Sequence, residues 1–153
     1  MDRLIVALAT GLYSGKIPFA PGTWGSALAL IPWYFCRGLT LVNYLIVLAV
    51  IFVVGFLTSG SAEKIMDRPD PGCIVIDEIL GMFITLTLAP NHPAAWLLGF
   101  VLFRIFDVLK PFPVSWLDTH LHGGIGIMMD DVMAGLYALL CLQIIWLVIG
   151  RFF

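Results

Sequence analysis

The chain has little charge for its length. Only 12% of its 153 residues are charged, whereas 61% are hydrophobic and the mean hydropathy is +1.02. Soluble domains are about 25% charged and roughly 45–50% apolar. A soluble fold of this size has too little interior to bury so much apolar surface. The composition therefore argues against a soluble protein and favours lipid as the solvent.

Basic clusters and paired cysteines are missing as well. The formal net charge is -2 and no run of Lys or Arg occurs, which argues against a nucleic-acid partner. Cys36, Cys73 and Cys141 form neither a C-x-x-C pair nor a Cys/His metal spacing, so we expect packing thiols. The length suits one domain, and we predict a single domain over residues 1–153.

What the chain does contain is long apolar stretches, at residues 17–36, 38–62, 79–103 and 132–150. About twenty helical residues cross the roughly 30 Å hydrocarbon core, so the second and fourth stretches predict spanning helices. Pro-Asn-His-Pro at 90–93 interrupts the third, which predicts a helical hairpin with arms at 74–89 and 94–109. In the first stretch, prolines and glycines leave room for a helix only at 24–35, which is short for a crossing.

These patterns predict an all-α fold, a polytopic membrane helical bundle of about five membrane segments with short interfacial helices. Threading the segments alternately gathers five cations on one side of the membrane: Lys16, Lys64, Arg68, Arg104 and Lys110. Only Arg37 and Arg151 fall on the other side, so the positive-inside rule makes the first side cytoplasmic. Every acid beyond Asp2 falls on that same side, where we expect the chemistry.

Two pairs of adjacent acids stand beside apolar helices. Asp77-Glu78 and Asp130-Asp131 each put like charges together at the predicted start of a helix. A helix N-terminus stabilises one anion of each pair, so capping alone is one interpretation. Several carboxylates that meet without matching cations favour instead a hard cation such as Mg²⁺, which prefers oxygen ligands. We therefore predict a metal site on the cytoplasmic side.

Three further patterns have both a structural and a functional interpretation. Arg104, Asp107 and Lys110 recur every three residues and so share one helical face, either as a structural ion-pair ladder or as part of the site. A glycine-rich segment that includes Gly124 predicts a flexible turn whose N–H groups can approach an anionic oxygen. In the first loop, Thr23 and its neighbour Ser26 can cap a helix or contact phosphate.

Four segments together resemble the phosphatidylglycerophosphatase A family. They are P-x-x-P-G-T-x-G-S from Pro18, I-V-x-D-E from Ile74, F-R-x-x-D-x-x-K-P from Phe103, and H-G-G-x-G-I-M-x-D-D from His122. The resemblance extends from about Gly11 to Gly135. It implies a single membrane-embedded phosphatase domain of the bacterial cytoplasmic (inner) membrane, dependent on Mg²⁺. The implied substrate is a membrane lipid, phosphatidylglycerophosphate, which is hydrolysed to phosphatidylglycerol and phosphate.

The resemblance also assigns roles to individual residues. The implied metal ligands are Asp70, Asp77, Glu78, Asp107, Asp130 and Asp131. Of these, Asp77, Glu78, Asp107 and Asp131 are also expected to be catalytic, and the choice of general base among Asp77, Glu78 and Asp131 stays open. The implied phosphate-binding residues are Arg104, Lys110, Thr23 and Gly124. Asp118 and His122 fall at family-like positions as well.

Two other classes of function compete with this interpretation. A small Mg²⁺ or ion transporter would be lined by the same acids, but it should carry polar groups at both mouths. The side that holds Arg37 and Asn91 has no acid at all. A non-enzymatic assembly protein is the other alternative. The signature of a cysteine phosphatase, C-x5-R, is absent, because Cys36 is followed at once by Arg37 and neither Cys73 nor Cys141 has an arginine six residues later.

Overall fold

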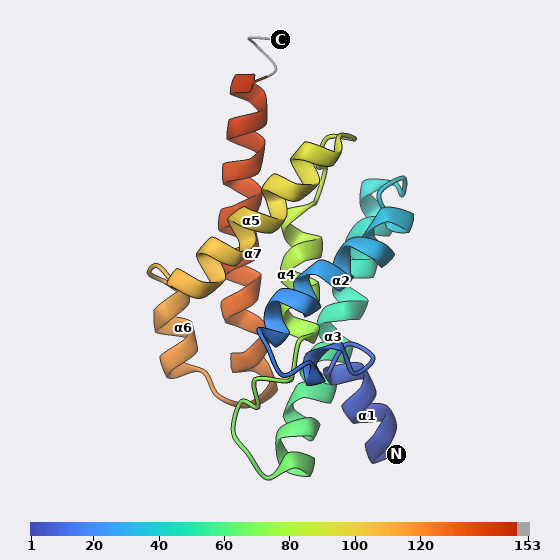
Figure 1. The fold of residues 1–153 in the computed structure, drawn as a ribbon, viewed down its shortest axis with the longest axis vertical. Coiled ribbons are helices and arrows are strands. Elements are labelled where there is room, and N and C mark those ends of the chain that lie inside the picture. Colours follow the sequence, from blue (N-terminus) through green and yellow to red (C-terminus); the bar gives the residue numbers. More distant parts are fainter. Residues whose placement is uncertain (150–153) are drawn as a thin grey trace.

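Figure 1 shows a computed structural model of the chain, in which residues 1–149 are described. In chain order the elements are α1 (Asp2–Ala9), the 3₁₀ turn η1 (Ser14–Lys16), α2 (Pro21–Cys36), α3 (Leu41–Met66), α4 (Ile76–Thr85), α5 (Pro93–Leu109), α6 (Val114–His120) and α7 (Gly123–Ile149). No strand occurs among these residues, so the all-α prediction is confirmed. Gly150, the last residue of the fourth apolar stretch, and Arg151, assigned above to the far side of the membrane, lie outside the described residues.

Two helices are long and apolar enough to cross a membrane. They are α3, with 26 residues, and α7, with 27 residues. Their outward side chains are large and apolar, for example Val42, Ile46 and Val53 on α3 and Ile144 on α7, as expected for helices whose solvent is lipid. The helices α2, α4 and α5 have 16, 10 and 17 residues, fewer than an upright crossing needs. Five membrane segments therefore stay a prediction.

The short helix α4 lies at the centre of the bundle. Figure 1 shows it enclosed by α2, α3, α5 and α7, and it contacts all four. Leu80, Met82 and Phe83 on α4 are buried. Close packing with both α5 and α7 depends on Gly81, where an added Cβ would lie 2.3 Å from the Phe103 ring on α5 and 3.0 Å from the backbone oxygen of Asp131 on α7. Small residues at such crossings let backbones approach, which is how helices associate in lipid.

The predicted hairpin is present, with α4 and α5 as its arms, but the first arm is shorter than predicted, because α4 ends at Thr85 and not at residue 89. At the far end of the bundle, Arg37 after α2 donates a hydrogen bond from Nη1 to Asn91 Oδ1 in the hairpin turn, at 2.8 Å. The two residues that the sequence assigned to the side without acids therefore do lie together.

The glycine-rich segment at 123–126 is not a flexible turn, so that prediction is wrong. It forms the first turn of α7, and an added Cβ on Gly124 would lie 2.2 Å from the backbone oxygen of Phe56 on α3. The glycine is required because α3 and α7 approach closely here. Since α7 starts at Gly123, Asp130 and Asp131 lie well inside the helix and not at its start.

Helix α2 also begins differently from the prediction. Its first residue is Pro21, and the preceding Ala20 occupies the N-cap without a side-chain hydrogen bond. Capping by Thr23 or Ser26 is therefore wrong. Ser26 is fully buried, and its Oγ donates instead to the backbone oxygen of Gly22 at 2.7 Å. This bond directs the Ser26 hydroxyl back along its own helix, α2.

Candidate active site

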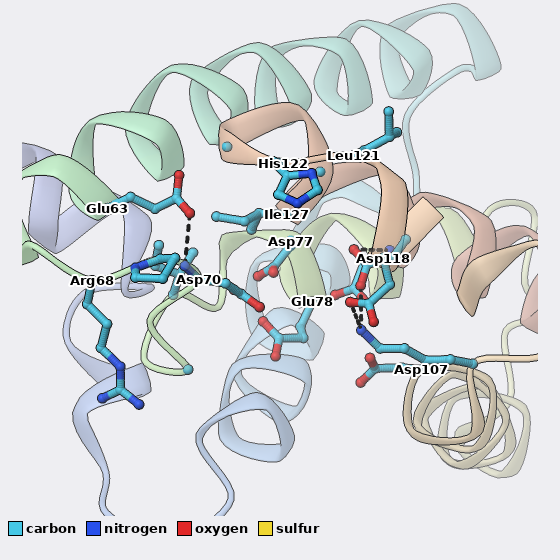
Figure 2. A pocket seen from close by; sticks show the side chains of 18 of the residues that line it. Glu63, Arg68, Asp70, Asp77, Glu78, Asp107, Asp118, Leu121, His122 and Ile127 are labelled. Carbon is cyan, nitrogen blue, oxygen red and sulfur yellow. Dashed lines mark hydrogen bonds and ion pairs between the residues drawn. The ribbon is translucent and has the colours of Figure 1, made fainter. Parts of the chain in front are cut away.

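The acids that the sequence singled out line one pocket of about 610 Å³. The last turn of α3, the start of α4, the end of α5, helix α6 and the first turns of α7 surround it (Figure 2). Its acidic lining residues are Glu63, Asp67, Asp70, Asp77, Glu78, Asp107, Asp118, Asp130 and Asp131. Five helices and the loop after α3 thus bring carboxylates to one place, and the six predicted ligands are all among them.

Three of these acids form the centre of the pocket. Asp77, Glu78 and Asp131 each offer one carboxylate oxygen, and the three oxygens lie within 4.8 Å of one another. Asp77 and Glu78 come from the first turn of α4, and Asp131 comes from α7 at the crossing that Gly81 permits. The trio is therefore a product of the close contact between α4 and α7.

The donor set of the trio fits a hard divalent cation. Asp77 Oδ1 and Glu78 Oε2 are buried and have no hydrogen-bond partner among the described residues. Buried polar atoms normally find a partner, because leaving a carboxylate oxygen without one is costly. Carboxylate oxygens are the ligands that Mg²⁺ prefers. Asp77, Glu78 and Asp131 would hold such an ion, whereas Asp70, Asp107 and Asp130 line the same pocket outside this group.

Arg104 stands behind the acids and does not line the pocket. It forms an ion pair with Asp107, as the three-residue spacing predicted, and Nη1 also donates to Ser26 Oγ at 3.4 Å. An added Cβ on Gly22 would lie 2.3 Å from Glu78 Oε1 and 3.0 Å from Arg104 Nη1. The Glu78 carboxylate and the guanidinium therefore both rest against Gly22. This geometry favours a role in holding the acids over the predicted contact with phosphate.

Lys110 does not continue the ladder of Arg104 and Asp107. It is the C-cap of α5, with a left-handed φ of 42°, so its side chain leaves the face of the helix. Its Nζ donates to Asp118 Oδ1 and, at 2.8 Å, to Asp130 Oδ2. Burial on its own would lower the pKa of Lys110, but the hydrogen bonds and charges of these two carboxylates raise it above its ordinary value. Lys110 thus stays charged and ties α6 to α7.

Asp70 lies in the loop between α3 and α4, at the edge of the pocket. Its backbone N–H donates to Glu63 Oε1 at 2.9 Å, which attaches the loop to the end of α3. Partial desolvation raises the pKa of Asp70 above its ordinary value, although the charge of Lys110 opposes this shift. The position is consistent with a ligand at the rim and not at the centre.

Like Arg104, the predicted phosphate-binding residues Thr23 and Gly124 do not line the pocket, so Lys110 is the one of the four that does. Conversely, the pocket includes residues to which the sequence gave no role: Glu63, Lys64, Asp67 and Arg68. The sequence did contain a signal for them, because the positive-inside rule assigned Lys64 and Arg68 to the same membrane face as the acids. What was missing was the length of α3, which continues to Met66 and so carries Glu63 and Lys64 to the pocket.

Comparison with known proteins agrees with this picture. The model of the family described as Phosphatidylglycerophosphatase A matches residues 7–146. A phosphatidylglycerophosphatase A of Escherichia coli is 43% identical over 129 residues, which are 84% of this chain and 75% of that protein. The one of Haemophilus influenzae is 43% identical over 135 residues, 87% of this chain and 83% of that protein.

A third relative bears a different name. A Bacteroides thetaiotaomicron protein that is provisionally named phosphatidylinositol-3-phosphatase is 36% identical over 154 residues, 96% of each chain. No solved structure matches the fold. The family match covers the whole pocket, and two relatives of the same name match most of the chain. This chain belongs to the phosphatidylglycerophosphatase A family.

Proposed function

We propose that the chain hydrolyses the terminal phosphate of phosphatidylglycerophosphate, which gives phosphatidylglycerol and inorganic phosphate, and that Mg²⁺ is held by Asp77, Glu78 and Asp131. Family membership and the names of the Escherichia coli and Haemophilus influenzae relatives support the reaction. The observation that carries the metal assignment is the trio of carboxylates, two of which have buried oxygens without a partner.

The acidity of the pocket makes a cation necessary for this reaction. A phosphate monoester is anionic, and a pocket lined by carboxylates alone would repel it. The chemistry that a bound Mg²⁺ would supply is neutralisation of the phosphate oxygens and easier ionisation of the attacking water. A second carboxylate oxygen of the trio, one that does not hold the ion, would accept the proton of this water.

Lys110 is the pocket cation best placed to donate a hydrogen bond to a phosphoryl oxygen. An ammonium group has three N–H donors, and Asp118 and Asp130 use two of those of Lys110. The third is free to face the substrate and to stabilise charge on the phosphoryl group during transfer. Arg104 acts from behind, through Asp107 and Glu78.

The membrane arrangement belongs to the same proposal. The last turn of α3 and the first turns of α7 both line the pocket, so the pocket lies at one end of both candidate spans. A site at this level lets a lipid head group enter while its acyl chains stay in the bilayer. We infer that α2, α4 and α5 complete about five membrane segments, and that the pocket faces the cytoplasm of a bacterial inner membrane, by the positive-inside rule.

The transport alternative gains no support from the fold. At the opposite end of the bundle, where Arg37 meets Asn91, the described residues provide no second group of acids. A pathway for a cation would need polar groups at both mouths. The name of the Bacteroides thetaiotaomicron relative, in contrast, favours a second candidate substrate, a phosphoinositide monophosphate, at the same site.

The test is phosphate release by the purified protein in detergent. With Mg²⁺ present, we expect release from phosphatidylglycerophosphate, and we expect it to stop when a chelator is added and to return with excess Mg²⁺. Release that survives chelation would contradict the metal assignment. Running phosphatidate and phosphatidylinositol 3-phosphate in parallel separates the two candidate substrates, because a faster rate on the phosphoinositide would replace the first by the second.

A further inference from the structure

A second, much smaller cavity lies at the end of the bundle opposite the acidic pocket. Its volume is about 50 Å³, and the end of α2, the start of α3 and the connection between α4 and α5 surround it. The acidic pocket lies at the Met66 end of the candidate span α3, whereas this cavity lies at its Leu41 end. Figure 1 shows the start of α3 beside the end of α2, far from α6. The small cavity therefore faces the other side of the membrane, and the proposed reaction does not use it.

Arg37 lines this cavity and is held in place by its neighbours. Its guanidinium carbon lies 3.9 Å from the centre of the Tyr34 ring and 5.1 Å from that of the Trp96 ring. Its Nη1 donates to Asn91, but no carboxylate within residues 1–149 forms an ion pair with it. A guanidinium has five N–H donors, and the described residues accept from one of them. A positive charge with free donors thus stands beside the cavity.

The indole of Trp33 gives the same cavity a buried donor. Trp33 is 2% exposed and lines the cavity, and its Nε1 has no hydrogen-bond partner among the described residues. The Tyr44 hydroxyl is near this nitrogen, but it does not meet it in hydrogen-bond geometry and donates its own proton to the backbone oxygen of Phe83. A buried N–H without an acceptor is costly. It is therefore suited to an oxygen atom that enters the cavity from outside.

The surroundings of the cavity are those of a lipid head group. Leu39, Leu41 and Leu88 line it and are exposed, and Leu45 continues the exposed apolar face of α3 one turn further into the span. Aromatic residues next to a cation, such as those that hold Arg37, are typical of the membrane interface. Acyl chains that lie along α3 would place a phosphate at the level of Arg37.

We propose that Arg37 and the indole N–H of Trp33 bind the phosphodiester of a membrane phospholipid, in the leaflet opposite the acidic pocket. A volume of about 50 Å³ admits one or two oxygen atoms and not a whole head group, because one water molecule occupies roughly 30 Å³ in the liquid. One phosphate oxygen enters the cavity and accepts from Trp33, while the guanidinium fork faces the others. A water molecule would satisfy the indole but leave the charge of Arg37 without a partner.

This site is separate from the proposed reaction. It depends on the membrane arrangement of α3 and uses none of the residues that line the acidic pocket. Its ligand is a resident lipid and not the substrate. Loss of phosphatase activity would therefore leave the proposal standing, and failure of the proposal would leave the phosphatase assignment unchanged.

The experiment measures thermal unfolding of the full chain in neutral detergent micelles. A chelator is present, so that no metal ion holds a lipid phosphate at the acidic trio. Three probes are compared: dioleoylphosphatidylcholine, dioleoylglycerol, which lacks the phosphate, and glycerophosphocholine, which lacks the acyl chains. We expect the phospholipid to raise the unfolding temperature of wild type by about 2–5 °C more than either of the others.

The variants assign this difference to the cavity. Arg37→Ala and Arg37→Gln should both lose most of it, and the second keeps much of the side chain, which excludes a packing defect as the cause. Trp33→Phe keeps a ring but removes the N–H, and should lose about half. Arg3→Ala is the matched control, because Arg3 is an exposed arginine of α1 that lines neither cavity. It should keep the full difference.

Each opposite result overturns the inference. Equal stabilisation by dioleoylglycerol would mean that the acyl chains alone bind, and equal stabilisation by glycerophosphocholine would assign the site to a soluble anion. An equal loss in Arg3→Ala would assign the effect to general attraction between lipid and positive charge. A full difference in Trp33→Phe would show that the phosphate does not enter the cavity.

Discussion

Replacing Gly22 by Ala tests how the acidic centre is held. An added Cβ at this position would lie 2.3 Å from Glu78 Oε1 and 3.0 Å from Arg104 Nη1. The atoms it meets are the ends of flexible side chains and not backbone. They can therefore move without disturbing α2 or α4. The substitution should displace the Glu78 carboxylate while the fold stays intact.

The expected magnitudes differ for stability and for function. Restoring an ordinary contact requires the carboxylate to shift by about 1 Å, and such a misplacement can cost about 100-fold in rate. Overpacking costs about 1–3 kcal/mol of unfolding free energy, but Ala gains roughly 1 kcal/mol over Gly inside a helix. Gly22 lies in the first turn of α2, so part of that gain applies. We expect a large loss of activity with a small change in the free energy of unfolding.

The assay measures phosphate release against Mg²⁺ concentration, together with thermal unfolding in detergent. In Gly22→Ala we expect a kcat at least about tenfold lower and a higher Mg²⁺ concentration for half-maximal rate. Gly38→Ala is the control, because nothing lies within 4 Å of an added Cβ there. Wild-type rates and Mg²⁺ dependence in Gly22→Ala would refute the argument that this glycine positions Glu78.

A double-mutant cycle makes the same argument sharper. Glu78→Asp shortens the side chain that the added methyl group would meet, so adding Gly22→Ala to Glu78→Asp should cost much less than it does in wild type. If the two losses simply add, the contact between the methyl group and the Glu78 carboxylate is not the cause.

Two other predictions concern the centre and the opposite end of the bundle. Asp77→Asn should abolish phosphate release. With chelator present it should not lower the unfolding temperature, because it removes one of several like charges. Added Mg²⁺ should raise the unfolding temperature of wild type more than that of this variant. Tyr44→Phe removes a buried hydroxyl that donates to the backbone oxygen of Phe83 at 2.6 Å. It should cost about 1 kcal/mol of unfolding free energy and leave kcat unchanged, because Tyr44 lies outside the pocket.

Much of the fold follows from apolar length and from turn residues. The run that became α3 and the hairpin at residues 90–93 were predictable because long apolar runs and paired prolines act locally. The start of α7 was not. Its glycines favour a turn by propensity, and only the approach of α3 to Gly124 makes the helix preferable. A contact between segments distant in sequence decides that boundary.

The site divides in the same way. Adjacent acids beside apolar residues are rare and costly, so Asp77, Glu78 and Asp131 were visible in the sequence. The roles of the cations were not, because they depend on where α5 ends. Lys110 is beyond the last turn and reaches Asp130, whereas Arg104 is within the helix and turns to Asp107. Residues three apart share a face only while the helix continues.

The small residues of the motifs gain a physical explanation from this geometry. Mutually repelling carboxylates have to be held together in the absence of the cation, and lipid supplies no hydrophobic force between helices. Close packing has to supply the holding force instead. Gly81 brings α7, and with it Asp131, against α4, and Gly22 lets α2 lie against the Glu78 carboxylate. The glycines near the acids therefore help to build the acidic centre, although glycine has no side chain that could bind a metal ion.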